Sequence, residues 1–275
     1  MVRLGNGVRI AIFLVVVVGV VSAPKLLRER PVSTESAPPP LAQVEAKPAS
    51  TQAAAPVAEA PHLAAARKDM VEHQLRSRDI SDPRVLEVMG RVRRHDFVAP
   101  AQAGAAYEDH PLPIGHGQTI SQPYIVALST QLVGVKPQGR ALDIGTGSGY
   151  QAAVLAELYK EVYSIEILKP LADDAGKRLA ELGYKNVTVR HGDGYLGWPE
   201  HAPFDAIIVA AAAEHVPQPL VDQLAPGGKL VIPVGTFYQN LLVLEKQADG
   251  SVRRQNVAPV AFVPMTGEAQ KHRGK

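Results

Sequence analysis

Three glycines at alternate positions, Gly145, Gly147 and Gly149, constrain the fold of this chain more than any other feature. They follow residues 141–144, Ala-Leu-Asp-Ile, which predict a strand, and they precede a helical pattern. Glycine lets the backbone turn tightly and approach a ligand, so this turn predicts a binding crevice beyond a strand end. The dinucleotide fingerprint places its third glycine three residues after the second, where this chain has Tyr150. The Gly-Lys-Ser or Gly-Lys-Thr ending of a P-loop is also missing, so the segment is either another cofactor loop or simply a turn.

Short β-branched runs alternate with helical patterns from residue 140 onward, which is typical of a parallel sheet with crossover helices. The strands that we expect are 141–144, 162–166, 187–189, 206–209 and 229–232, with a final pair at 241–245 and 257–263. The expected helices are 64–76, 83–89 and 124–132, then 151–158, Pro170 to Gly183, and a short helix opened by Pro219 and closed by Gly227 and Gly228. These patterns predict an α/β fold, with a doubly wound, mostly parallel sheet, a helical N-terminal cap and a C-terminal antiparallel strand pair.

The composition of the whole chain excludes several classes of function. The chain has 275 residues and is 46% hydrophobic, which is enough for a packed core over most of its length. Its formal net charge of +2 is too small to indicate a nucleic-acid partner. It contains no cysteine, so disulfides, thiolate zinc sites and cysteine nucleophiles are excluded together, and we expect no metal site.

The N-terminal part of the chain differs in composition from the rest. Residues 10–23 are almost wholly apolar and are flanked by arginines, so residues 1–30 predict a signal-peptide-like segment or a membrane anchor. Three interpretations stand side by side: export with cleavage, an uncleaved anchor in contact with a membrane, and a misassigned start near Met70. Residues 31–61 are rich in proline and alanine and predict a disordered linker, which leaves 62–275 as the folded domain.

The spacing of the glycines resembles the AdoMet-binding loop of class I methyltransferases, in which they occupy every second position after an acidic residue. The cofactor residues that this resemblance implies in the loop are Asp143, Gly145, Thr146, Gly147, Ser148 and Gly149. AdoMet carries no phosphate, so no basic cradle is required, and its sulfonium is compatible with the Asp143 carboxylate. Glu166 ends the second strand and is expected to bind the ribose hydroxyls, and Asp193, followed by Gly194, to bind the adenine amino group. Taken singly, Glu166 is a strand end and Asp193 a turn former, but together they favour a cofactor site.

The segment from Leu112 to Tyr124 contains Pro-Ile-Gly-His-Gly-Gln-Thr-Ile-Ser-Gln-Pro and resembles the signature of the protein-L-isoaspartate O-methyltransferases. The resemblance covers roughly residues 64–268. It implies that Ser121 is the active-site serine, which hydrogen-bonds the substrate carboxylate. The other positions that the resemblance assigns are cofactor contacts at Thr119 and Ile120 and substrate contacts at Val263 and Thr266.

Ser121 also has a local interpretation, as the N-cap of the helix that passes through Tyr124. Both roles can hold together, because helix N-termini attract carboxylates. The serine lacks the Gly-x-Ser-x-Gly context of a nucleophile elbow, so a serine hydrolase is excluded.

The resemblance implies an enzyme that transfers a methyl group from AdoMet to the free carboxylate of L-isoaspartyl residues in damaged proteins, and so initiates repair through a succinimide. A carboxylate with a pKa of about 4 is already ionised at neutral pH, so no general base is needed. The alternatives are a class I methyltransferase acting on a small molecule or nucleic acid, and a non-catalytic adapter that keeps the fold as a binding module. The resemblance and the supply of AdoMet imply a cytoplasmic, monomeric catalytic domain, whereas the N-terminal segment indicates anchoring or export.

Overall fold

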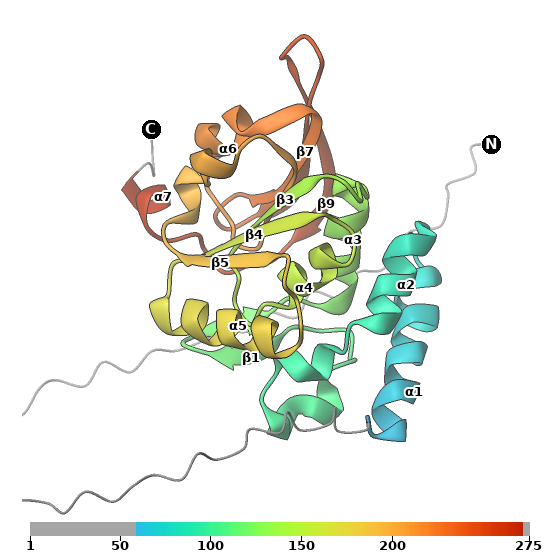
Figure 1. The fold of residues 1–275 in the computed structure, drawn as a ribbon. Helices are drawn as coiled ribbons and strands as arrows, with labels where there is room; N and C mark the ends of the chain where they lie inside the picture. Colours follow the sequence, from blue (N-terminus) through green and yellow to red (C-terminus); the bar gives the residue numbers. More distant parts are fainter. Residues whose placement is uncertain (1–58, 272–275) are drawn as a thin grey trace, which may run out of the picture. The chain divides into compact units, whose positions relative to one another are not determined.

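The computed structural model describes residues 59–271, and its centre is a seven-stranded sheet (Figure 1). The strands, in spatial order, are β5 (Val187–His191), β4 (Glu161–Glu166), β3 (Arg140–Ile144), β6 (Phe204–Val209), β7 (Leu224–Val234), β8 (Gln239–Lys246) and β9 (Val252–Val260). The first five in this order are parallel to one another, and β8 and β9 are antiparallel, as predicted. Strand order reverses between β3 and β6, which is where open α/β sheets bind their ligands.

The two faces of the sheet belong to two different hydrophobic cores, because successive strand side chains point to opposite faces. In β6, Ala206 and Ile208 belong to the first core, and Ile207 and Val209 to the second. The first core is covered by α3 (Pro123–Val133), α4 (Tyr150–Ala156), α5 (Lys169–Glu181) and the N-terminal cap. The second is covered by shorter elements, η4 (Gly194–Leu196), η5 (Pro199–His201), α6 (Gln218–Asp222) and α7 (Glu268–Lys271). Helices therefore lie on both faces, as expected for a doubly wound fold.

The N-terminal cap consists of α1 (Pro61–Asp69), which continues as the π-helical turn η1 (Met70–Arg76), and of α2 (Pro83–Arg91). Two 3₁₀ turns, η2 (Arg94–Phe97) and η3 (Pro100–Ala105), follow it. Asp82 caps α2, because its carboxylate accepts a hydrogen bond from the backbone N–H of Arg84 at 2.9 Å.

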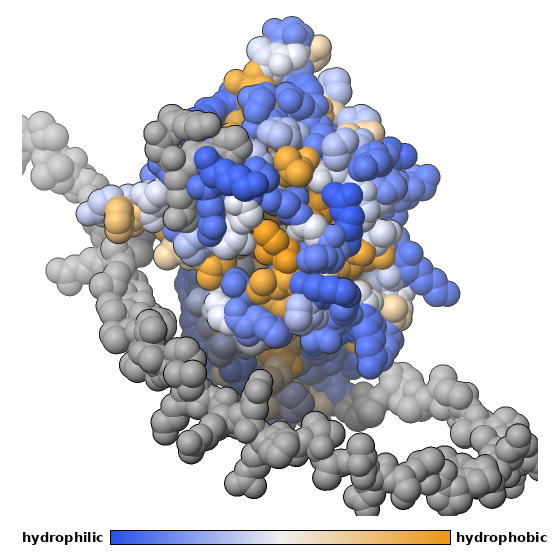
Figure 2. Space-filling view, turned by 90° about the vertical axis from the view of Figure 1, so that its left-hand side faces the viewer, coloured by the Kyte–Doolittle hydropathy of each residue, from blue (hydrophilic) through white to orange (hydrophobic). Residues whose placement is uncertain are grey.

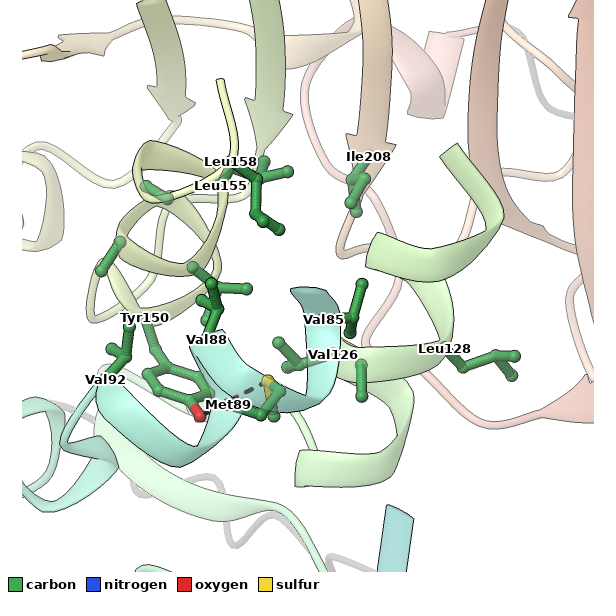
Figure 3. Packing of buried hydrophobic residues seen from close by; sticks show 14 of the residues in the cluster. Val85, Val88, Met89, Val92, Val126, Leu128, Tyr150, Leu155, Leu158 and Ile208 are labelled. Carbon is green, nitrogen blue, oxygen red and sulfur yellow. Dashed lines mark hydrogen bonds between the residues drawn. The ribbon is translucent and has the colours of Figure 1, made fainter. Parts of the chain in front are cut away.

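Figure 3 shows how the cap reaches the sheet domain. Val88 and Met89 of α2 lie beside Tyr150 at the start of α4, and Val85 lies beside Val126 of α3. The Tyr150 hydroxyl donates to the Met89 sulfur at 3.8 Å. The cap thus packs against the first turns of the two helices that also line the pocket described below.

Most predicted boundaries agree with the structure to within two or three residues, and α5 ends as its sequence suggests. Gly183 is left-handed, with φ 88°, and its N–H donates to the Ala180 carbonyl, while the N–H of Tyr184 donates to the Leu179 carbonyl. These two bonds form a Schellman motif.

Two predictions at the end of the chain need correction. β7 begins at Leu224 and includes Gly227 and Gly228, which we had expected to close a helix. The last strand was predicted at 257–263, but β9 spans Val252–Val260, because pairing with β8 extends it through exposed polar residues that carry no apolar pattern. Figure 2 shows one face of the molecule, on which apolar residues lie in small groups among polar ones.

The described residues begin slightly before the expected boundary at residue 62. α1 begins at Pro61, and the Glu59 carboxylate accepts a hydrogen bond from Arg67 Nη2 at 2.9 Å. The predicted signal-peptide-like segment and most of the predicted linker lie outside the described residues. Within 59–271, no helix has the length and apolar character needed to cross a bilayer, and no cluster of three potential metal ligands occurs.

Candidate active site

A pocket opens at the carboxyl ends of β3, β4 and β6, beside the switch point in strand order. It contains about 1020 Å³ of empty space, part of it open to solvent. Of the predicted site residues, those that line it are Thr119, Ile120, Ser121, Gly145, Thr146, Gly147, Ser148, Glu166, Gly194, Val263 and Thr266. Five segments that are far apart in the sequence therefore meet at one place.

The glycine loop after β3 has the backbone geometry that its spacing predicts. Gly145, Gly147 and Gly149 all have positive φ values, of 91°, 53° and 95°. The N–H groups of Gly145 and Thr146 donate to the Ile165 carbonyl at 2.9 and 3.2 Å, which fixes the loop to the end of β4. Non-glycine residues rarely adopt this conformation, so each glycine serves the turn itself.

Glu166 is buried at the end of β4 and holds two backbone segments. One carboxylate oxygen accepts from the Gly147 N–H at 2.8 Å, and the other accepts from the Leu168 N–H at 2.9 Å. A carboxylate has about four lone-pair sites, so further hydrogen bonds from ligand hydroxyls can be accepted. Glu166 is also the only charged side chain among the residues that line the pocket.

Asp143 lies behind the glycine loop and is absent from the pocket lining. Its Oδ2 accepts a hydrogen bond from the Ser164 hydroxyl at 2.8 Å, and that hydroxyl lies 2.6 Å from the Thr146 hydroxyl. Burial raises the pKa of Asp143 to about 7, and the negative charge of Glu166 adds to the effect. The structure thus connects Asp143 to the pocket through the loop residue Thr146.

Asp193, also absent from the pocket lining, fastens two backbone segments. Its Oδ1 accepts from the Tyr195 N–H at 2.9 Å, and its Oδ2 accepts from the Glu268 N–H at 2.7 Å. The second bond ties the end of β5 to the C-terminal segment that contains Thr266. The neighbouring Gly194 does line the pocket, and a Cβ there would lie 2.3 Å from Ile144 Cγ2, so only glycine fits.

Ser121 lies between the hairpin β1 (Leu112–Gly115)/β2 (Gln118–Ile120) and α3. The N-cap interpretation of Ser121 is wrong: the N-cap of α3 is Gln122, whose side chain instead donates to the Asp109 carboxylate at 2.8 Å. Ser121 lines the pocket close to the N-terminus of an 11-residue helix.

The hairpin also lies against the glycine loop, since a Cβ on Gly147 would be 3.1 Å from Ile114 Cδ1. Its turn residues His116 and Gly117 both have positive φ, as a type I′ turn requires. The serine segment and the glycine loop are therefore packed together.

Sequence reasoning missed about half of the lining. The additional residues are Gln118, Val126, Ile144, Tyr150, Gln151, Ile165, Ile167, Leu168, Ala210, Ala211, Pro264, Met265. Most are apolar neighbours of predicted residues and have no polar signal of their own. Ala210 and Ala211, the first two residues of an alanine run that follows β6, are examples.

Comparison with known proteins agrees with this geometry. The family model of protein-L-isoaspartate(D-aspartate) O-methyltransferase matches residues 65–270. A protein-L-isoaspartate O-methyltransferase 2 from Syntrophobacter fumaroxidans is 60% identical over 188 residues, covering 68% of this chain and 76% of the relative. A protein-L-isoaspartate O-methyltransferase from Gloeobacter violaceus is 55% identical over 206 residues, covering 74% of this chain and 100% of the relative.

Solved structures show the same relationship. A protein-L-isoaspartate O-methyltransferase structure superposes with a TM-score of 0.67 at 28% identity, covering 74% of this chain and 67% of that chain. A Plasmodium falciparum protein assigned to the same enzyme class, solved in complex with S-adenosyl-L-homocysteine, gives a TM-score of 0.63 at 30% identity and covers 73% of this chain and 98% of that chain. The chain belongs to the protein-L-isoaspartate(D-aspartate) O-methyltransferase family and is an AdoMet-dependent methyltransferase.

Proposed function

We propose that this chain transfers the methyl group of AdoMet to the free carboxylate of L-isoaspartyl residues in proteins, and that Ser121 holds that carboxylate. The observation that carries the proposal is the meeting of Ser121, the glycine loop and Glu166 in one pocket. Family membership supports the substrate class, and the pocket supports the assignment of roles to individual residues.

Several independent features of the pocket match the charge and hydrogen-bonding groups of AdoMet. Its one charged lining residue is acidic, which suits a ligand with a positive sulfonium and no phosphate. Glu166 can accept hydrogen bonds from the ribose hydroxyls while it still binds the glycine loop. The Ser148 hydroxyl is buried and has no partner among the described residues, so a ligand atom can satisfy it. The lack of a basic lining also disfavours the nucleic-acid alternative.

The residues of the chain act mainly by placement. AdoMet supplies an electrophilic methyl group on a positively charged sulfur. Ser121 would donate a hydrogen bond to one oxygen of the substrate carboxylate, with the N-terminus of α3 adding a favourable dipole. The carboxylate is ionised at neutral pH, so no lining residue has to remove a proton.

Alignment of the reacting groups and exclusion of water supply the catalysis. Well-oriented groups can gain about 7–11 kcal/mol from positioning alone. The apolar residues Ile120, Ala210 and Val263 line the pocket and limit the access of water to the reacting atoms. The methyl ester then leaves the enzyme. The backbone nitrogen of the next residue attacks the ester carbonyl and expels methanol, which forms a succinimide whose hydrolysis restores part of the normal aspartate.

The test uses the full chain, methyl-labelled AdoMet and two peptides that differ only in isoaspartate versus aspartate. We expect a base-labile methyl ester on the isoaspartyl peptide alone. Equal labelling of both peptides, or labelling of neither while AdoMet binds, would overturn the substrate assignment but leave the fold and cofactor unaffected.

We also propose that the catalytic domain acts as a monomer in the cytoplasm, where AdoMet is made. Membrane contact or export through residues 10–23 is the competing prediction. Cell fractionation of the full chain with a C-terminal tag separates the two, because a periplasmic or membrane-bound product would contradict a free cytoplasmic enzyme.

A further inference from the structure

Two aromatic side chains project into solvent at the turn between β7 and β8. Phe237 is 96% exposed and Tyr238 is 92% exposed. The other large hydrophobic residues exposed within 59–271, Leu196 and Val252, are only 50% and 39% exposed. Aromatic side chains gain much from burial, so two adjacent ones left in water mark an interaction surface.

The turn lies at the same end of the sheet as the pocket. β7 runs parallel to β6, and the residues that follow β6, Ala210 and Ala211, line the pocket. The N–H of Gly235, which opens the turn, donates to the Ala213 carbonyl at 2.9 Å. The turn is therefore attached to the segment that leaves the pocket.

The other side of the turn is attached to the segment that contains Val263 and Thr266, which the resemblance assigns to the substrate. Gln239 follows Tyr238, and its side chain donates to the Phe262 carbonyl at 3.1 Å and accepts from the Phe262 N–H at 2.6 Å. The next residue, Val263, lines the pocket. Along these contacts, two residues, Gln239 and Phe262, separate Tyr238 from the pocket residue Val263.

The backbone of the turn is packed closely at Gly235. Gly235 has φ 131°, and a Cβ at this position would lie 2.0 Å from the Tyr238 carbonyl oxygen. The turn is closed tightly on its inner side, so the side chains at its tip extend outward.

We propose that Phe237 and Tyr238 bind the stretch of substrate polypeptide that flanks the isoaspartyl residue. This inference rests on the proposed function. A protein substrate can place only one residue in the pocket, so its neighbours must cross the rim where this turn stands. Apolar and backbone groups of the flanking chain pack on aromatic faces without regard to sequence, which suits an enzyme whose substrate residue arises in many contexts.

The test compares two isoaspartyl peptides with the full chain. One has a single neighbour on each side of the isoaspartyl residue, and the other has about ten residues, which can span roughly 30 Å, with apolar neighbours. The double variant F237A/Y238A should raise the KM for the longer peptide about 10-fold, equivalent to about 1.4 kcal/mol. The kcat, the AdoMet affinity and the KM for the short peptide should not change.

The matched control is Val252→Ala, which removes exposed apolar surface from the far end of the same sheet. It should leave both KM values as they are. Equal effects of the double variant on the two peptides, or no effect on either, would overturn the inference, as would a loss of self-association with unchanged KM values. Failure of the unmodified chain to methylate either peptide would instead overturn the proposed function, and the inference with it.

Discussion

The two halves of the pocket are built differently. The cofactor half consists of the glycine loop and Glu166, which are buried and joined by hydrogen bonds to backbone N–H groups. The proposed substrate half consists of the segment 119–121, the segment 263–266 and the exposed turn after β7. Backbone hydrogen bonds of Ala212 and Gly235 and side-chain hydrogen bonds of Gln239 join the last two of these, and the turn carries exposed aromatic side chains. A rigid backbone site suits a cofactor of fixed shape, whereas a rim of exposed side chains suits protein substrates of varied sequence.

Replacing Glu166 by alanine should disrupt the cofactor half most. The variant loses a charged acceptor for ligand hydroxyls and frees two backbone N–H groups, each charge-assisted bond being worth about 1.5–3 kcal/mol. We expect the affinity for S-adenosylhomocysteine to fall about 100-fold or more, measured by calorimetry. Glu181→Ala, which removes an exposed carboxylate from α5, is the matched control and should bind normally. Unchanged affinity in Glu166→Ala would remove the assigned ribose contact.

Ser121→Ala should affect only the substrate half. Loss of one hydrogen bond to a charged carboxylate predicts a decrease in kcat/KM of about 10- to 100-fold. Because the serine hydroxyl is not assigned to the cofactor, the calorimetric affinity for S-adenosylhomocysteine should stay the same. A large loss of cofactor binding would show that the two halves are not separable at this residue.

Asp193→Ala tests the connection between the halves. The substitution leaves the N–H groups of Tyr195 and Glu268 without their acceptor, so the free energy of unfolding should decrease by about 1–3 kcal/mol in urea titrations. The predicted adenine contact requires a loss of AdoMet affinity as well. A destabilised variant that binds AdoMet normally would identify Asp193 as purely structural.

The effect of Asp143→Asn concerns folding stability and depends on pH. The folded-state pKa of about 7 lies above the usual value of 3.8, so the contribution of this group to stability is greatest at low pH and decreases as pH rises from about 4 to 7. Asparagine cannot ionise, so the variant should gain a few °C in Tm relative to the unmodified chain at pH 8, and little at pH 4. A constant difference between the two pH values would contradict a buried, titrating Asp143.

Local sequence patterns were sufficient to predict the parallel part of the sheet and the glycine loop. Buried strands such as β6 consist of apolar residues on both faces, and a left-handed turn needs glycine, so both leave a local signal. β9 was misplaced because its exposed residues, Arg253 to Gln255, are held by pairing with β8 rather than by burial. The capping role given to Ser121 was wrong because α3 begins one residue later than that role requires, with Gln122 at the N-cap and its side chain bound to Asp109.

The sequence by itself determined the class of fold, the cofactor loop and, through the signature around Ser121, the family. Only the tertiary structure decided that Asp143 lies behind the loop and that Asp193 binds backbone from residue 268. It also decided that Phe237 and Tyr238 are exposed on a turn attached to Phe262. The physical reason is the distance along the chain over which each property is determined. Backbone conformation and strand burial depend on neighbouring residues, whereas the partner of a carboxylate and the exposure of an aromatic depend on segments brought together by folding.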